Sequence, residues 1–261
     1  MERAVSVVTG ASTGIGAAFA LALAARGNDV VLVSRNELRL KELAGALEGE
    51  HGGTMEVLPA DLGTDEGVAT VEARLSDDAR PIELLVNNAG MLTIGLFHTI
   101  PIEGELAEIN LNVIALVRLT RAALGPMVER GHGGVINISS VGAYQPTPNS
   151  ATYSATKAFV SSFTNAVHEE LRGTGVKAMA LAPGFTHTEI HERANVENTQ
   201  SLPEFLWQAP DEVVQAALKA YDKGRANCIP GAMNSVAAAF SSVFPAAVTR
   251  KVAGMVTGRT Y

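Results

Sequence analysis

Short runs of consecutive apolar residues alternate along the chain with longer segments in which apolar residues recur every three or four positions. Apolar, β-branched runs of four to seven residues that stop at glycine or at a polar residue are typical of strands buried on both faces. We therefore expect seven strands, at 5–9, 30–33, 55–58, 82–86, 134–138, 176–182 and 226–230.

The segments between these runs have the amphipathic period of helices. They lie at 17–26, 36–47, 64–75, 105–127, 152–172 and from Pro210 onward. Strands that alternate with helices of this length indicate βαβ units. The pattern predicts an α/β fold, a single-domain, doubly wound (Rossmann-type) parallel sheet flanked by helices, over residues 1–261. No internal repeat or domain linker interrupts it.

Two segments near the C-terminus differ from this pattern. Residues 188–210 are polar and aperiodic before Phe205, which favours a variable lid over the substrate. Residues 231–261 form an apolar C-terminal helical segment that Asn234 and Pro245 interrupt. That is too polar for a comfortable transmembrane span, so we expect a buried or subunit-facing helix, with weak peripheral membrane contact left open.

Charge and cysteine content narrow the classes of function. The 261 residues carry a net charge of −7, which argues against a nucleic-acid partner, because phosphate binding needs a basic face. A single cysteine, Cys228, suits a reducing compartment, and the N-terminus lacks the apolar core of a signal peptide, so we expect a cytoplasmic protein. No metal site is expected, since His187 and His191 lack a ligand partner.

A glycine-rich segment follows the first predicted strand and precedes a helix. Backbone N–H groups at a helix start face phosphate, and glycines let the backbone approach it closely. The order of elements predicts a cradle for a dinucleotide pyrophosphate, although the GxxxGxG spacing differs from the GxGxxG fingerprint. The residues expected to form it are Gly10, Ser12, Thr13, Gly14, Ile15 and Gly16.

The ends of the second and third strands bear on the choice of dinucleotide. An acidic residue at the end of the second strand bonds the ribose 2′-hydroxyl of NAD, whereas an arginine accommodates the 2′-phosphate of NADP. This strand ends at Ser34-Arg35, and the next carboxylate, Glu37, belongs to a helix, which favours NADP(H) over NAD(H). Asp61, which precedes Leu62, either caps the following helix or holds an adenine amine.

The fifth strand leads to Ser139 and Ser140, and a glycine- and proline-rich turn then leads to a helix. Tyr153 and Lys157 are four residues apart on that helix and so share one face. A lysine ammonium beside a phenol favours the phenolate, so we expect the pKa of Tyr153 to fall below its usual value of about 10. Such a phenol acts as a general acid or base near neutral pH.

Together these segments resemble the classical short-chain dehydrogenase/reductase family. The match extends from Thr9 to Thr188, about two thirds of the chain. In order, it comprises Thr9-Gly-x3-Gly-x-Gly16, Asp61, Asn87-Asn-Ala-Gly90, Asn112, Ser140, Tyr153-x3-Lys157 and Pro183-Gly184 with Thr188. The variable region after Glu189 carries over only loosely.

The resemblance implies four catalytic residues. Tyr153 would be the general acid in carbonyl reduction and the base in alcohol oxidation. Ser140, which the family spacing selects over Ser139, would hydrogen-bond the substrate oxygen. Lys157 would lower the tyrosine pKa and bind the nicotinamide ribose. Asn112, selected over Asn110, would kink its helix and hold a water that feeds protons to Lys157.

The resemblance also implies further cofactor contacts. Asn88, Ala89 and Gly90 would line the adenosine side, and Thr186 and Thr188, after Pro183 and Gly184, would approach the carboxamide. One departure concerns the glycine turn, where NADP-preferring members often carry a basic residue and this chain has Thr13. The preference for NADP(H) therefore rests mainly on Arg35.

The sequence thus predicts an NADP(H)-dependent oxidoreductase that interconverts a carbonyl and a secondary alcohol. The apolar share of residues 91–98 and 142–145 and of the lid favours a small apolar substrate. Two alternatives stay open, an NAD(H)-dependent hydroxysteroid-type alcohol dehydrogenase and a non-catalytic dinucleotide-binding sensor. The apolar helices 105–127 and 152–172 suggest a homodimer or homotetramer.

Overall fold

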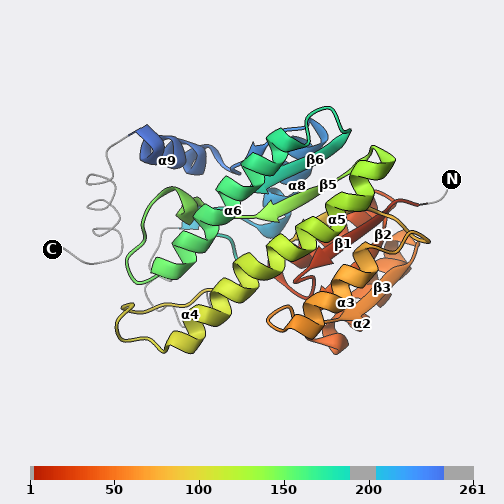
Figure 1. Cartoon of the computed structure of the whole chain (residues 1–261), viewed down its shortest axis with the longest axis horizontal. Coiled ribbons are helices and arrows are strands. Elements are labelled where there is room, and N and C mark those ends of the chain that lie inside the picture. The colour runs from red at the N-terminus through yellow and green to blue at the C-terminus, as the bar shows by residue number, and fades with distance from the viewer. Residues whose placement is uncertain (1–2, 189–203, 244–261) are drawn as a thin grey trace.

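A computed structural model describes residues 3–188 and 204–243 of the chain. This part folds into a parallel sheet with helices on both faces (Figure 1). The seven strands, in the spatial order β3-β2-β1-β4-β5-β6-β7, confirm the predicted doubly wound fold. They are β1 Val5–Thr9, β2 Asp29–Ser34, β3 Met55–Pro59, β4 Ile82–Asn87, β5 Gly133–Ile138, β6 Val176–Leu181 and β7 Asn227–Cys228.

The strand order reverses between β1 and β4. The chain runs outward from β1 through β2 to β3, then returns to place β4 on the other side of β1. In an open parallel sheet, ligands bind beyond the carboxyl ends of the strands at such a reversal. The loops that follow β1, β4, β5 and β6 therefore meet at one edge of the sheet.

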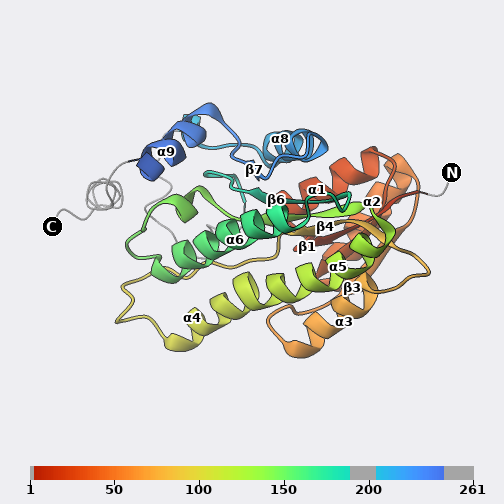
Figure 2. The same ribbon diagram turned by 45° about the horizontal axis from the view of Figure 1, so that its top comes forward.

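The helices form two layers, one on each face of the sheet (Figure 2). One layer contains α1 Gly14–Ala25, α2 Glu37–His51 and α8 Pro210–Asp222, and the other α3 Asp65–Leu75, α5 Leu116–Arg130 and α6 Ala151–Glu170. The predicted helix 36–47 is confirmed but extends to His51. Leu38 of this helix is 74% exposed, so it does not share the core face of Leu40 and Leu47.

Alternate residues of each strand enter different cores. Val8 and Leu32 pack with α1, α2 and α8 on one face, whereas Val7 and Val31 pack with α3, α5 and α6 on the other. All four are essentially inaccessible to solvent. Burial of one such side chain contributes about 1.5–3 kcal/mol, which is why these strands have continuous apolar runs.

The predicted helix 105–127 spans Ile102 to Arg130 but has three parts. They are α4 Ile102–Ile109, a π-helical turn Asn110–Ala115, and α5. Single π-helical turns within α-helices frequently occur at functional sites. Here the turn contains Asn112, so the predicted distortion at this residue is present.

The same helix, Ile102–Arg130, is the one candidate membrane span by length and hydropathy among the described residues. One such helix is weak evidence, because core helices of soluble proteins pass the same test. This helix packs against β4 and β5, and its Arg118 pairs with Glu72 and Asp65 of α3. The apolar C-terminal segment 231–261, for which the sequence left weak membrane contact open, begins with the helix α9 Ala232–Val243. Its residues from 244 onward lie outside the described part.

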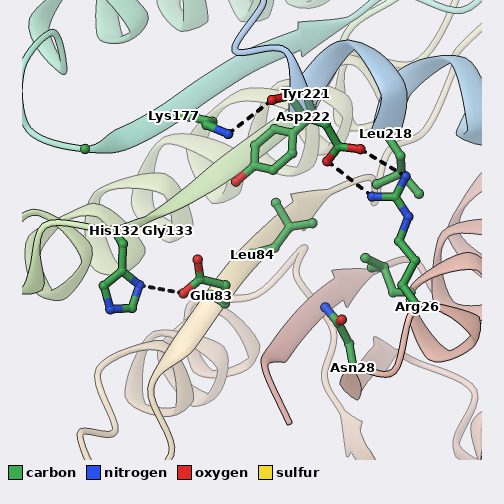
Figure 3. Close-up of a pocket in the computed structure, with 12 residues that line it drawn as sticks. Arg26, Asn28, Glu83, Leu84, His132, Gly133, Lys177, Leu218, Tyr221 and Asp222 are labelled. Atoms are coloured by element: carbon green, nitrogen blue, oxygen red, sulfur yellow. Dashed lines mark hydrogen bonds and ion pairs between the residues drawn. The ribbon is translucent and has the colours of Figure 1, made fainter.

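A cavity of about 300 Å³ lies at the opposite, amino edge of the sheet (Figure 3). Residues at the starts of three strands, Glu83, Gly133 and Lys177, line it. Its charges are largely paired, with His132 bound to Glu83 and Arg26 bound to Asp222. The cavity is therefore separate from the loops at the carboxyl ends of the strands.

Candidate active site

Thr9, the last residue of β1, joins the glycine turn to the loop after β4. Its Oγ1 accepts the backbone N–H groups of Asn88 (2.9 Å) and Ala89 (3.0 Å). The Asn88 side chain donates in return to the carbonyl oxygens of Thr9 (2.8 Å) and Gly10 (3.3 Å). Asn88 therefore braces the glycine turn with its side chain.

The three glycines of this turn cannot be replaced by a larger residue without strain or a steric clash. Gly10 and Gly14 have φ values of +65° and +55°, which L side chains rarely adopt. A Cβ on Gly16 would lie 2.1 Å from the Gly10 carbonyl oxygen. Thr13 precedes α1 without a side-chain cap, so the N–H groups of the first turn are available to a phosphate, as the sequence predicted. Ser12 and Ile15 belong to the same turn.

The carboxyl end of β2 offers a buried hydroxyl and an exposed cation. Ser34 Oγ is buried and has no hydrogen-bond partner within the described chain, and a buried polar atom in that state normally awaits a ligand or water. Arg35 beside it is exposed, and no ion pair engages its guanidinium in the described residues. A hydroxyl and a guanidinium at this point suit a phosphorylated ribose.

At the end of β3, the Asp61 carboxylate accepts the Gly63 N–H at 3.0 Å. Thr64, rather than Asp61, caps α3, through the Gly67 N–H. The Leu62 side chain packs in the core, so only its backbone is available to a ligand. Asp61 is exposed, and among the described residues its second carboxylate oxygen accepts no hydrogen bond, which leaves it able to accept from an amine.

Two adjacent serines after β5 have different surroundings. Ser139 is buried, and its Oγ donates to the Lys157 carbonyl oxygen (2.8 Å) and contacts Ser161 Oγ (2.7 Å). Ser140 Oγ accepts the Gly142 N–H (3.1 Å) and hydrogen-bonds Tyr153. Only Ser140 therefore faces the phenol, whereas Ser139 anchors α6 to β5.

Lys157 lies behind the Tyr153 ring, 5% exposed, with Nζ 5.7 Å from the ring centroid. Its ammonium donates to the Ile138 carbonyl oxygen at 2.9 Å. Burial lowers the pKa of Lys157 to about 8, and the Glu108 carboxylate opposes that shift. Since this value lies above neutral pH, the side chain is mostly cationic at pH 7.

The expectation that Lys157 lowers the pKa of Tyr153 is wrong in this structure. Burial has the largest influence and raises the pKa of the phenol, a hydrogen bond with Ser140 lowers it, and Glu108 raises it further. The lysine charge is directed at the Ile138 carbonyl and not at the phenol oxygen. At neutral pH Tyr153 is therefore a protonated donor.

Asn112 holds the loop after β4 against the π-helical turn. Its Oδ1 accepts the Met91 N–H and its Nδ2 donates to the Met91 carbonyl, each at 2.9 Å, and Nδ2 also donates to Thr156 Oγ1 at 3.2 Å. A Cβ on Gly90 would lie 3.1 Å from Asn112 Oδ1 and 3.5 Å from Lys157 Nζ. The loop backbone thus lies directly beside the lysine. Asn110 is exposed and takes no part.

Sequence reasoning missed two buried carboxyl groups beside this site. Glu105 and Glu108 on α4 are 3% and 0% exposed, and both contact the hydroxyl of Thr93. With Asn112 they recur at intervals of three and four residues, so they share one helix face with the catalytic asparagine candidate. This spacing in the sequence could have indicated that the two glutamates lie beside Asn112.

The loop after β6 reaches back to the glycine turn. Thr188 lies against Gly14, where an added Cβ would meet the Thr188 methyl at 2.8 Å. Thr186 is buried and donates to the Gly184 carbonyl, and the Pro183 carbonyl accepts the Val141 N–H beside Ser140. Beyond Thr188, residues 189–203 of the predicted lid lie outside the described chain, so its role remains a prediction.

The described residues therefore bring every predicted site residue to one edge of the sheet, with Leu62 contributing only backbone. They contain no group of three or more histidine, cysteine, aspartate or glutamate side chains able to hold a metal.

A family model described as short chain dehydrogenase matches residues 4–199. The chain belongs to the short-chain dehydrogenase family. Members of this family are oxidoreductases. The resemblance stated from the sequence motifs is thereby confirmed, as is the expected fold.

Individual relatives and solved structures belong to the same family. A short chain dehydrogenase of Pseudocercospora fijiensis is 35% identical over 205 residues, covering 77% of this chain and 65% of that protein. The chain thus spans about two thirds of that relative's length. The structure of a short-chain dehydrogenase from Sphingobium yanoikuyae in complex with NADPH is 39% identical, with a TM-score of 0.83 and coverage of 93% and 96%. A bulky-bulky ketone specific alcohol dehydrogenase from Comamonas testosteroni is 32% identical, with a TM-score of 0.80 and coverage of 94% and 96%.

Proposed function

We propose that this dehydrogenase reduces the carbonyl group of an apolar small molecule with NADPH, and catalyses the reverse oxidation of the secondary alcohol. The observation that carries the proposal is the Tyr153 phenol, bonded to Ser140 and backed by the buried Lys157 ammonium. Carbonyl reduction places negative charge on the substrate oxygen, which needs a hydroxyl donor and a proton source. Ser140 supplies the first and Tyr153 the second.

The raised pKa of Tyr153 suits the reductive direction at neutral pH. A phenol that is protonated at pH 7 gives its proton to the substrate oxygen. In alcohol oxidation the same phenol must lose its proton first, so that direction is favoured at alkaline pH. Bound NADPH supplies the hydride and does not require the protein to carry redox chemistry.

The choice of NADP(H) over NAD(H) rests on Ser34 and Arg35. Within the described part of the chain the Arg35 guanidinium forms no ion pair and the Ser34 hydroxyl has no hydrogen-bond partner, which matches a ribose 2′-phosphate. No carboxylate stands at the end of β2 to prefer a free 2′-hydroxyl. The relative from Sphingobium yanoikuyae, described in complex with NADPH, supports the same choice.

The proposed substrate is an apolar ketone or the corresponding alcohol. The turn Val141–Tyr144 follows Ser140 directly and is partly buried, and burial raises the pKa of the Tyr144 phenol. The relative from Comamonas testosteroni, specific for bulky-bulky ketones, supports a substrate of this class. The single Cys228, half-buried and unpaired, fits the reducing cytoplasm as the place of reaction.

Alanine at the two adjacent serines should separate catalysis from structure. Ser140→Ala should lower kcat by about 10²–10³-fold, the loss expected for one donor to a developing oxyanion. Ser139→Ala should keep most of the activity but lower the free energy of unfolding by about 1–3 kcal/mol, because its buried bonds to Lys157 and Ser161 are lost. Steady-state kinetics and urea unfolding of both variants check this. Equal kinetic losses in the two variants would contradict the assignment of Ser140.

We also propose a homo-oligomer that pairs the apolar outer face of α4 with its counterpart. Ile102, Leu106 and Ile109 lie along one face of α4 and are 53%, 52% and 37% exposed, and Phe159 on the neighbouring α6 is 43% exposed. Apolar surface of this extent marks an interaction site. A partner subunit that covers it also accounts for the hydropathy of this helix.

Leu106→Glu should therefore convert the oligomer to a monomer, because it buries a charge in the proposed interface. Light scattering coupled to size exclusion measures the mass. Leu38→Glu, at an exposed leucine of α2, is the matched control and should leave the mass unchanged. A wild-type protein that is monomeric at micromolar concentration would refute the interface.

A further inference from the structure

The buried pair Glu105 and Glu108 makes more contacts with one hydroxyl than two ionised carboxylates can. Thr93 Oγ1 lies 2.5 Å from Glu105 Oε1 and also contacts Glu108 Oε2. A threonine hydroxyl has one hydrogen, and an ionised carboxylate only accepts. One contact is therefore a donation from Thr93, and the other is favourable only if a carboxyl group donates to Thr93.

The remaining contacts indicate which carboxyl group holds the proton. Glu108 Oε2 accepts the Thr93 N–H at 2.9 Å, and its Oε1 lies 3.5 Å from Asn112 Nδ2. Glu105 contacts two hydroxyls, those of Thr93 and Thr152, each able to accept a hydrogen. Glu108 thus has the surroundings of a carboxylate and Glu105 those of an acid.

We propose that Glu105 and Glu108 share one proton through the Thr93 hydroxyl, and that the single negative charge left on Glu108 keeps Lys157 in its ammonium form behind Tyr153. The pair is a positioning element for the catalytic residues, since neither carboxyl group contacts the reacting atoms. It also fixes the loop after β4, because Glu108 and Asn112 hold its backbone at Thr93 and Met91.

The electrostatics show why the pair resists a second negative charge, and that the hydrogen bonds from Thr93 and the charge of Lys157 favour the carboxylate form of Glu108. Burial has the largest influence on Glu108 and raises its pKa, the hydrogen bonds from Thr93 lower it, the Glu105 carboxyl raises it, and Lys157 lowers it. Glu108 in turn raises the pKa of both Lys157 and Tyr153. In the described chain the titratable groups facing Glu108 are Glu105 on α4 and Tyr153 and Lys157 on α6. The π-helical turn and the 91–93 loop contribute only uncharged partners.

The shared proton is testable without turnover. Infrared difference spectra at pH 7 between wild type and Glu105→Gln should show a protonated carboxylic acid C=O stretch that the variant lacks, and Glu108→Gln should lose the same band. Glu103→Gln, at an exposed glutamate of α4, is the matched control and should lose only a carboxylate signal. A carboxylate signal alone in the Glu105→Gln spectrum would overturn the proposal.

Stability gives a second readout that does not depend on the proposed function. The raised pKa of Glu108 in the folded protein contributes stability that is fully present below the unfolded value of about 4.3 and is lost as pH rises through the folded pKa. Glu105→Gln removes the Glu105 carboxyl, which raises that pKa, so the loss becomes smaller and the stability of the variant relative to wild type should increase as pH rises from about 4 toward neutral; a flat difference would contradict a shared proton. Glutamine preserves both hydroxyl contacts, so the variant should fold.

The catalytic consequence rests on the proposed function and needs a pH profile. Because Glu108 raises the pKa of Tyr153, Glu108→Gln should move the acidic limb of alcohol oxidation to lower pH, by on the order of one unit. In Glu105→Gln the limb should stay at the wild-type pH, since Glu108 keeps its charge. An equal shift in both variants, or none in Glu108→Gln, would overturn the influence of the Glu108 charge on the catalytic residues. Absence of turnover in wild type would instead refute the proposed function and leave the infrared result intact.

Discussion

Replacing Tyr153 with phenylalanine should lower kcat/KM for carbonyl reduction by at least about 10²–10⁴-fold, the contribution typical of a general acid. The phenol is the acidic group that hydrogen-bonds Ser140 and lies beside the Lys157 ammonium. Phenylalanine keeps the ring and its packing, so NADPH should bind with an unchanged dissociation constant. Stopped-flow kinetics for turnover and fluorescence titration for binding measure the two effects separately.

Tyr221→Phe is the matched control for this substitution. Tyr221 lies at the amino edge of the sheet, in the cavity opposite the catalytic residues (Figure 3). Loss of its hydroxyl should leave kcat and KM within about twofold, the range expected for a change outside the site. Turnover retained in Tyr153→Phe, or lost equally in Tyr221→Phe, would refute the role of Tyr153.

Replacing Arg35 with leucine should weaken NADPH binding by roughly 10–150-fold, which corresponds to the loss of one charged hydrogen-bonding partner, about 1.5–3 kcal/mol. Binding of NADH should change little, because NADH lacks the 2′-phosphate that Arg35 would contact. Calorimetric titration of both cofactors gives the two affinities, and their ratio is the quantity predicted.

Arg172→Leu serves as the control for that ratio. Arg172 is another exposed arginine, paired with Glu169 on α6 and far along the chain from β2. Its loss should leave both affinities unchanged. Tighter binding of NADH than of NADPH by the wild-type protein would contradict the role of Arg35 directly, whatever the variants show.

Much of the fold could be predicted because local sequence and tertiary packing agree. Residues of β1 and β2 alternate between two cores, so both faces must be apolar and the runs are continuous. The glycine turn was predictable for a similar reason, since positive φ at Gly10 and Gly14 admits few other residues.

The features that could not be predicted from the sequence depend on contacts between residues that are distant in the chain. The pKa of Tyr153 depends on burial and on Glu108, 45 positions earlier, neither of which the Tyr-x3-Lys spacing reveals. Glu105 and Glu108 resemble an ordinary solvated helix face until Thr93 and α6 cover them. Leu38 illustrates the converse, because an apolar residue in a predicted helix can face solvent, as Leu38 does, while its neighbour Leu40 lies in the core.

The measurement that tests the central claim most directly is a screen of apolar ketones against purified wild-type protein, with NADPH and NADH followed by absorbance. The structure predicts ketone-dependent oxidation of NADPH at neutral pH, faster than that of NADH, because Tyr153 is protonated and Arg35 is available for a 2′-phosphate. Tight binding of NADPH without consumption by any ketone or formation from any alcohol would contradict it, and would favour a protein that binds the dinucleotide without catalysis.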